Sequence, residues 1–132
     1  MSRPYFASMP VRDLDKAKAF YTALGATLNP QFTGKDSACM QFSEHFFVMV
    51  MTQERWADFS KTPPVTGELA LGLFVDSRAA VDGMIEAAAA AGGKLVDEPT
   101  DHGFMYQRSI QDPGGHHWEI TWMDASQMPK AA

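Results

Sequence analysis

The chain has 132 residues, of which 45% are hydrophobic and 20% are charged, proportions typical of one globular domain. Its net charge is −5 and it has no basic stripe, so we expect no nucleic-acid partner. Cys39 is the only cysteine, which excludes an intramolecular disulfide and a cysteine-based zinc cluster. The first residues lack the apolar segment of a signal peptide, and no apolar run approaches the roughly 20 residues of a membrane span. We therefore expect a cytoplasmic protein with no membrane partner.

The first half of the chain predicts one helix among four strands. Residues 5–11 form the first strand, and Pro10, which cannot donate a ladder hydrogen bond, favours a place at a sheet edge. Asp13 is a helix N-cap, apolar residues then recur at helical spacing to Leu24, and Gly25 ends the helix. Further strands are expected at 27–33, 37–42 and 45–52.

The second half repeats this plan after a connector at residues 53–66, which contains a short predicted helix at 54–59. A longer helix is expected from a cap at Asp76 or Ser77 to about Ala91, where a glycine pair ends it. Strands are expected at 68–75, 94–96, 104–110 and 117–122.

The repeat indicates a single domain, 1–132, that contains two similar modules. Module one spans about 4–52, module two spans about 67–123, and residues 124–132 form a C-terminal tail. Two such modules placed side by side would make a cleft where their sheets meet.

The most informative stretch begins with a D-P-G-G turn at residues 112–115, where proline presets φ and the glycines accept positive φ. In the strand that follows, His117, Glu119 and Thr121 share one face, and apolar side chains occupy the other. Glu119 is either a solvated glutamate on a half-exposed strand or a cleft-facing group that ligates a metal or acts as a base.

Two motifs carry a resemblance: V-R-D-L-D-K-A-K-A-F-Y at residues 11–21 and D-P-G-G-H-H-W-E at residues 112–119. Together with the duplication, they resemble the vicinal oxygen chelate superfamily, which includes glyoxalase I, extradiol dioxygenases, methylmalonyl-CoA epimerase and bleomycin-resistance proteins. The resemblance implies an α+β fold of two βαβββ modules, whose curved, mostly antiparallel eight-stranded sheet surrounds a concave cleft. It also implies a homodimer.

In the metal-dependent relatives, the resemblance implies a divalent ion held by two residues from the first strands of the modules and two from the last strands. Glu119 matches one of these positions, whereas the other three fall on Val48, Phe6 and Leu69. A register shift of one residue would replace Leu69 by Glu68. Because one carboxylate does not hold a metal ion, we expect the usual metal site to be lost and no cofactor to be bound.

Other side chains give weaker hypotheses. An atypical divalent metal site is the alternative, with His102, His116, His117 and Glu119 as candidate ligands, because His117 and Glu119 share a strand face and are close enough to converge on an ion. His102 lies in a loop at the expected cleft rim, where it contacts the substrate or is a plain surface histidine. Arg108 could pair with Glu119 or bind an anionic substrate, and a plain surface salt bridge is the alternative. The predicted substrate contacts are Phe6, Ser8, Leu69, Leu71, His102, Phe104, Tyr106, Arg108 and His117, and the predicted catalytic residue is Glu119.

Three functions follow from these residues. The first is a protein of the bleomycin-resistance kind that binds a small apolar or aromatic molecule in the cleft without a metal. The second is a lyase, isomerase or dioxygenase of the glyoxalase, epimerase or dioxygenase kind that uses Glu119 as base or in an atypical metal site. The third, which ranks last, is a partner-binding module with no ligand.

Overall fold

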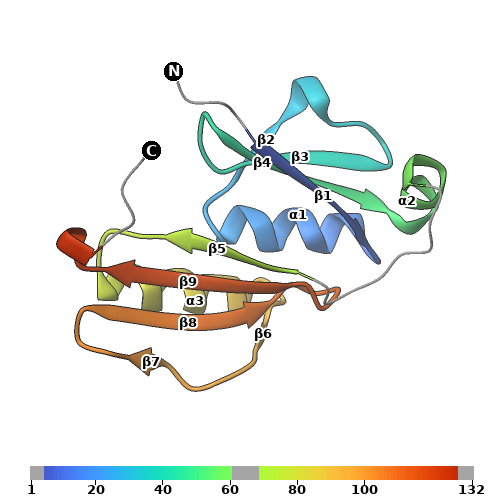
Figure 1. Cartoon of the computed structure of the whole chain (residues 1–132). Coiled ribbons are helices and arrows are strands. Elements are labelled where there is room, and N and C mark those ends of the chain that lie inside the picture. Colours follow the sequence, from blue (N-terminus) through green and yellow to red (C-terminus); the bar gives the residue numbers. More distant parts are fainter. Residues whose placement is uncertain (1–4, 61–68, 128–132) are drawn as a thin grey trace.

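The computed structural model describes residues 5–60 and 69–127 of the chain (Figure 1). Module one forms a sheet in the order β1-β4-β3-β2, with β1 parallel to β4 and the other neighbours antiparallel. β1 lies at the edge of this sheet, so the position predicted from Pro10 is confirmed. The strands are β1 (Tyr5–Val11), β2 (Thr27–Asn29), β3 (Ser37–Gln41) and β4 (Phe46–Thr52).

Helix α1 (Leu14–Ala23) follows β1 and packs on one face of the sheet. The Asp13 carboxylate accepts a hydrogen bond from the backbone N–H of Lys16 at 3.0 Å, which confirms the predicted N-cap. Phe20 and Tyr21 are fully buried on the sheet-facing side of the helix.

The strand predicted at 27–33 is shorter than expected. β2 ends at Asn29, whose side chain accepts a hydrogen bond from the backbone N–H of Gln31 at 3.0 Å and caps a short 3₁₀ helix, η1 (Pro30–Phe32). Proline lacks an N–H and has a fixed φ, which suits the first position of a helix and not a strand ladder.

Module two forms a sheet in the order β5-β9-β8-β6, and the short strand β7 also pairs with β8. β5 is parallel to β9, and the other pairs are antiparallel. The sequence does not predict β7 or the 3₁₀ helix η2, because neither is long enough to show a periodic pattern. The elements are β5 (Ala70–Phe74), α3 (Arg78–Ala90), β6 (Lys94–Leu95), β7 (Thr100–Asp101), β8 (Met105–Gln111), β9 (His117–Met123) and η2 (Ala125–Gln127).

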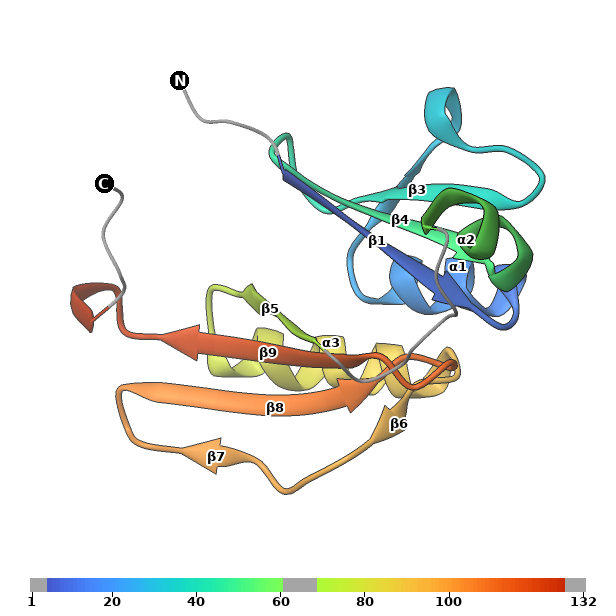
Figure 2. The same ribbon diagram turned by 45° about the vertical axis from the view of Figure 1, so that its right-hand side comes forward.

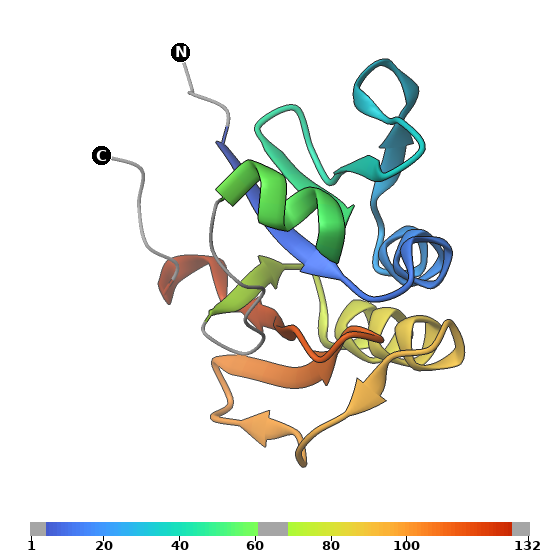
Figure 3. The same cartoon turned by 90° about the vertical axis from the view of Figure 1, so that its right-hand side faces the viewer.

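Part of the connector between the modules is helical, as predicted. α2 (Gln53–Ser60) lies against β1 and β4 at the end of the first sheet, and Figure 3 shows it on the other side of β1 from α1. The remainder of the connector, residues 61–66, lies outside the described residues.

The two modules share one core, and α1 and α3 lie side by side over it (Figures 2 and 3). The predicted α+β fold with two βαβββ modules is confirmed, and its strands fall into two hydrogen-bonded sheets. None of the described helices is long and apolar enough to cross a membrane. The core cluster includes Met9, Val11, Phe20, Tyr21, Leu24, Val48 and Val50 from module one, and Val81, Ile85, Ala88, Ile110, Trp118 and Ile120 from module two.

Gly93, which follows α3, is a position where only glycine fits. An added Cβ would lie 2.6 Å from the Phe20 ring, 2.7 Å from the Ile110 side chain and 2.9 Å from the carbonyl oxygen of Ala88. Gly83, by contrast, lies inside α3 with nothing within 4 Å of an added Cβ.

We expect Gly93→Ala to lower the free energy of unfolding by about 1–3 kcal/mol, because the added methyl group overpacks the core. Gly83→Ala should raise it by about 0.5–1 kcal/mol, because alanine loses less backbone entropy in a helix. Chemical denaturation of both variants measures the two changes. A Gly93→Ala protein as stable as the wild type would contradict the close packing of the end of α3 on module one.

Candidate functional site

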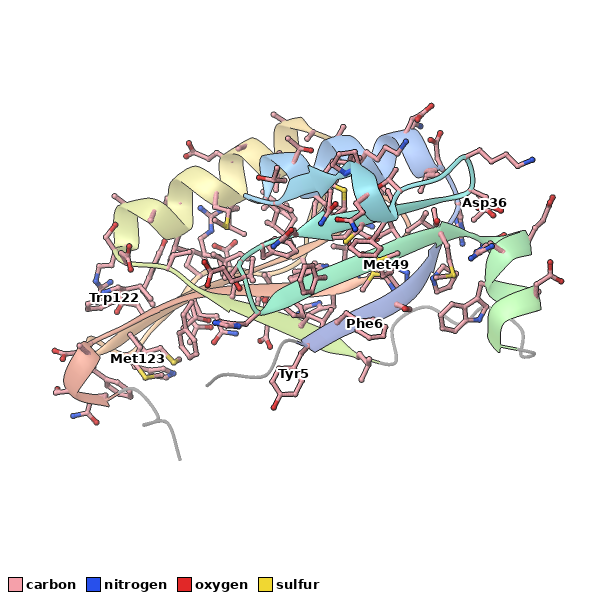
Figure 4. The ribbon with its side chains drawn as sticks, turned by 90° about the horizontal axis from the view of Figure 1, so that it is seen from above. Tyr5, Phe6, Asp36, Met49, Trp122 and Met123 are labelled. Carbon is pink, nitrogen blue, oxygen red and sulfur yellow. The ribbon has the colours of Figure 1, made fainter. Side chains whose placement is uncertain are left out.

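Each sheet has one face covered by α1 or α3 and a second face turned away from both helices, which we call the open face. Val48 and Val50 of β4 are fully buried in the core, and side chains alternate along a strand, so Phe47 and Met49 belong to the open face. Phe6 of β1 pairs with Phe47. Figure 4 shows Phe6 and Met49 on neighbouring strands, with α1 and α3 along the opposite side of the molecule.

The second sheet divides in the same way. Trp118 and Ile120 of β9 are fully buried, so Glu119 between them lies on the open face. Its cross-strand neighbours are Gly72 of β5, which adds no side chain beside it, and Ser109 of β8. The other open-face residues of these three strands include Phe74, Met105, Gln107, His117, Thr121 and Met123.

The two oxygens of the Glu119 carboxylate differ in their surroundings. The side-chain amide of Gln107 on β8 donates a hydrogen bond to Oε2. The other oxygen, Oε1, has no partner among the described residues and is not buried. Because each carboxylate oxygen accepts about two hydrogen bonds, Oε1 remains available as an acceptor.

Glu119 is the only carboxylate on the open face among the strand residues that the structure describes. The ionisable side chains of these strands, apart from Tyr5, Cys39 and Tyr106, are Lys94, Asp101, Arg108, His117 and Glu119. Asp101 and Arg108 point toward the α3 side, where each forms an ion pair with an α3 residue. Lys94 lies on the outermost strand, β6. His117 lies two residues before Glu119 on β9, which places their Cα atoms about 6.5–7 Å apart.

The structure brings together only some of the predicted contact residues. Phe6 and Ser8 lie on the open face of β1, and His117 accompanies Glu119 on β9. Leu69 directly precedes β5 and is 71% exposed. Leu71 packs against the core from the opposite face of the second sheet.

His102 and Phe104 lie in the loop between β7 and β8, with their rings stacked 6.3 Å apart. This loop is tied to α3, because Arg78 donates two hydrogen bonds to the Asp101 carboxylate at 2.7 and 2.9 Å. Those bonds lower the pKa of Asp101 to about 2. The loop is therefore anchored to the helix side of the second sheet and not to Glu119.

Arg108 does not pair with Glu119; the alternative, a plain salt bridge, is the one that the structure shows. Ile110 is buried in the core, so Arg108 and Tyr106, at the alternate positions of β8, also face α3. The Arg108 guanidinium and the Tyr106 hydroxyl both donate to Asp82 of α3, at 2.9 and 2.7 Å. The bond from Tyr106 and then that from Arg108 lower the pKa of Asp82.

Two of the predicted ligand positions were assigned one residue off. The ladders pair Gln41 with Phe47 and Gln111 with His117, so the two hairpins superimpose with Met49, and not Val48, in the place of Glu119. The error arises when His45 is aligned with His116, because this alignment matches Val48 with Glu119 and shifts the first hairpin by one residue.

The second correction concerns the ligand position on β5, which is counted back from the N-cap of the following helix, α3. Ser77, and not Asp76, caps α3, because its hydroxyl accepts from the backbone N–H of Ala80 at 3.0 Å. Counting from this cap makes Ala70, and not Leu69, the counterpart of Phe6. Glu68 lies outside the described residues.

A buried polar network holds β9 and its turn against module one. The Tyr21 hydroxyl of α1 donates to Asp112 Oδ2 at 2.7 Å and accepts from the Trp118 indole N–H at 3.1 Å. Asp112 Oδ1 accepts from the backbone N–H groups of Gly114 and His116, at 2.9 and 2.8 Å. The network therefore fixes the turn, the start of β9 and the orientation of Trp118, next to Glu119.

The same turn also reaches β1. The Nε2 atom of His116 lies 2.7 Å from the carbonyl oxygen of Pro10 and donates a hydrogen bond to it. The D-P-G-G-H segment is thus bonded to both the helix and the edge strand of module one.

Two surface hollows lie away from Glu119. One, of about 450 Å³, is lined by Arg12, Lys16 and the 112–114 turn, and the other, of about 580 Å³, lies beside Lys35 and the start of α2. Exposed charged side chains form part of both linings, among them Arg12 and Lys16 in the first hollow and Lys35 and Glu54 in the second.

Residues 4–120 match the model of the glyoxalase/bleomycin resistance protein/dioxygenase superfamily. The chain belongs to this superfamily. No match is found among curated proteins.

Several solved structures have a fold similar to that of this chain. A hypothetical protein from S. aureus is 26% identical, with a TM-score of 0.78 over 92% of this chain and 95% of the other. A glyoxalase-related enzyme from Fulvimarina pelagi is 21% identical, with a TM-score of 0.81 over 100% and 94%. A lactoylglutathione lyase from Agrobacterium tumefaciens is 16% identical, with a TM-score of 0.70 over 97% and 98%.

The residues present do not fit the divalent ion of metal-dependent superfamily members. With the register corrected, the four positions hold Phe6, Met49, Ala70 and Glu119, of which only Glu119 offers an oxygen or nitrogen ligand. Within residues 5–60 and 69–127, no three His, Cys, Asp or Glu side chains gather as a metal site would require.

The sequence reasoning missed Gln107 and Phe74, and it did not separate Phe47 from the other aromatic residues of the chain. Gln107 could have been found from the hairpin register, because counting outward from the D-P-G-G turn places it diagonally across from Glu119. Phe47 and Phe74 required the correct face of β4 and β5, which the continuous apolar runs of these strands do not reveal.

We expect Tyr21→Phe to lower the free energy of unfolding by about 2 kcal/mol or more, because it leaves Asp112 Oδ2 and the Trp118 N–H without their buried partner. Tyr5→Phe is the matched control, since Tyr5 is 68% exposed, and should change stability by less than about 0.5 kcal/mol. Urea denaturation measures both values. Equal stabilities of the two variants would show that the network does not join the modules.

The same residue gives an expected pH dependence. Burial, and then the negative charge of Asp112, raise the pKa of Tyr21 well above its usual value. The unfolded chain releases this proton near pH 10, so the stabilisation is intact below about pH 10 and falls as pH rises above it. The stability difference between wild type and Tyr21→Phe should therefore shrink above about pH 10 in denaturation at a series of pH values. A constant difference would contradict the raised pKa.

Proposed function

We propose that this superfamily member binds a small apolar or aromatic molecule on its open face, with Glu119 as the polar fixture and without a divalent metal. The observation that carries the proposal is the composition of this face. On the open face of the second sheet, a single carboxylate with an available oxygen stands near Phe74, which is 55% exposed, and the open face of the first sheet carries Phe6, which is 69% exposed. Exposed aromatic side chains around one polar group are typical of a ligand site.

An enzyme of the glyoxalase, epimerase or dioxygenase kind is the second candidate. The available Glu119 Oε1 favours it, because a carboxylate oxygen with no protein partner can take a proton from a substrate. An assay of glutathione-hemithioacetal isomerisation tests this candidate. The homodimer and the cytoplasmic location stay predictions.

Methionine methyl groups offer a direct test of ligand binding. Met49, Met105 and Met123 lie on the open face, whereas Met9 and Met40 are buried in the core. With naphthylmethanol as the probe, we expect NMR shifts of the first three methyl signals to saturate together, while the two core signals stay in place. Saturable shifts confined to other methionines, or no shifts at all, would overturn the proposal.

We also expect the protein purified without a histidine tag to contain far less than one divalent metal ion per molecule. Among the four positions matched to metal ligands, only Glu119 offers a suitable ligand. Elemental analysis measures the content after addition and dialysis of nickel, zinc or manganese. Stoichiometric metal that is lost in Glu119→Gln would contradict a metal-free site and support the enzyme candidate.

A further inference from the structure

We propose that the ligand of the open face carries a protonated amine, which binds to Glu119 Oε1. This inference rests on the proposed function and adds the ligand's charge to it. Glu119 is the one carboxylate that the described strands place on this face. The other two charged residues of β7 and β8, Asp101 and Arg108, point toward α3 and form ion pairs there.

The balance of charge around Glu119 disfavours an anionic group as the main anchor. Arg108, the cation that could have received one, is bonded to Asp82 on the other side of the sheet. Lys94 pairs with Gln111 and so belongs to the open face, but it stands on the outermost strand, two strands from β9, which carries Glu119. An anion beside Glu119 would therefore meet a like charge, and among the described residues no lysine or arginine on the same face of β5, β9 or β8 offsets it.

Gln107 acts as a positioning residue for the carboxylate. Its amide N–H is bonded to Glu119 Oε2, which restricts the carboxylate and leaves Oε1, which is not buried, as the available acceptor. A ligand with an N–H⁺ donor could then meet an oxygen whose orientation is already set, so less side-chain entropy is lost on binding.

The aromatic residues of the open face favour the same chemistry. Phe47 pairs with Phe6, and Phe74 pairs with Thr121, two positions along β9 from Glu119. Faces of aromatic rings attract cations as well as apolar groups. A molecule that joins an ammonium group to an aromatic ring could therefore use both features of this surface.

Three probes of similar shape and different charge test the inference: naphthylmethylammonium, naphthylmethanol and naphthoate. Their dissociation constants are measured by NMR titration of the open-face methionine methyl groups. We expect the ammonium compound to bind about tenfold more tightly than the alcohol, as for hydrogen bonds to charged groups, and naphthoate to bind most weakly.

Glu119→Gln should reduce the tenfold preference for the ammonium compound to about onefold, and Gln107→Leu should reduce it part-way, because the carboxylate is then less well fixed. Glu86→Gln is the matched control, since Glu86 is exposed on α3 and its loss lowers the overall negative charge equally. The preference should survive in this control.

The outcomes separate the two proposals. Equal binding of alcohol and ammonium compound on the open face, or a preference that survives Glu119→Gln, overturns the inference and leaves the proposed function intact. A preference that falls equally in Glu86→Gln also overturns it, because the effect is then one of net charge. If none of the probes shifts the open-face methyl groups, the proposed function itself fails.

Discussion

The hydrogen bond between the Tyr21 hydroxyl and the Asp112 carboxylate is the interaction on which the rest of the structure depends. Asp112 is only 2% exposed, and a buried carboxylate is strongly unfavourable unless its oxygens are satisfied. Tyr21 and two backbone N–H groups of the turn satisfy it. Because Tyr21 belongs to module one and Asp112 to module two, the hydroxyl of one module satisfies the buried carboxylate of the other.

This network also explains why the two sequence motifs occur together. The F-Y pair at the end of the first motif supplies Phe20 to the core and Tyr21 to the network, and the D-P-G-G-H-H-W-E motif supplies Asp112 and Trp118. Strand alternation then places Glu119, the next residue, on the opposite face. The chemical group of the proposed site is therefore positioned by the residues that close the core.

Local signals in the sequence predicted most of the fold. The Asp13 cap, the helical spacing of α1 and α3 and the repeat gave the helices, the main strands and the two modules. The errors arose where a prediction needed the exact partner across a sheet. One residue separates Val48 in the core from Met49 on the open face, and a strand register shifted by one exchanges the faces. Apolar residues on both faces of β4 hide this distinction in the sequence.

The structure places Glu119 on the open face, as alternation predicts, whereas its role as a site residue stays a prediction. Glu119 follows from the motif and from alternation alone, whereas Gln107 depends on the pairing of β8 with β9. Arg108 shows the converse case: a cation close in sequence to the site is directed by alternation to Asp82 on the other face. In this superfamily fold, three of the four positions matched to metal ligands hold Phe6, Met49 and Ala70, and the fourth, Glu119, lies on the open face.

The most direct test of this account is a crystal structure of the protein with naphthylmethylammonium. The account predicts the probe on the open face, with its nitrogen about 3 Å from Glu119 Oε1 and Gln107 still bonded to Oε2. A divalent ion coordinated by Glu119, or a probe bound away from the open face, would contradict it.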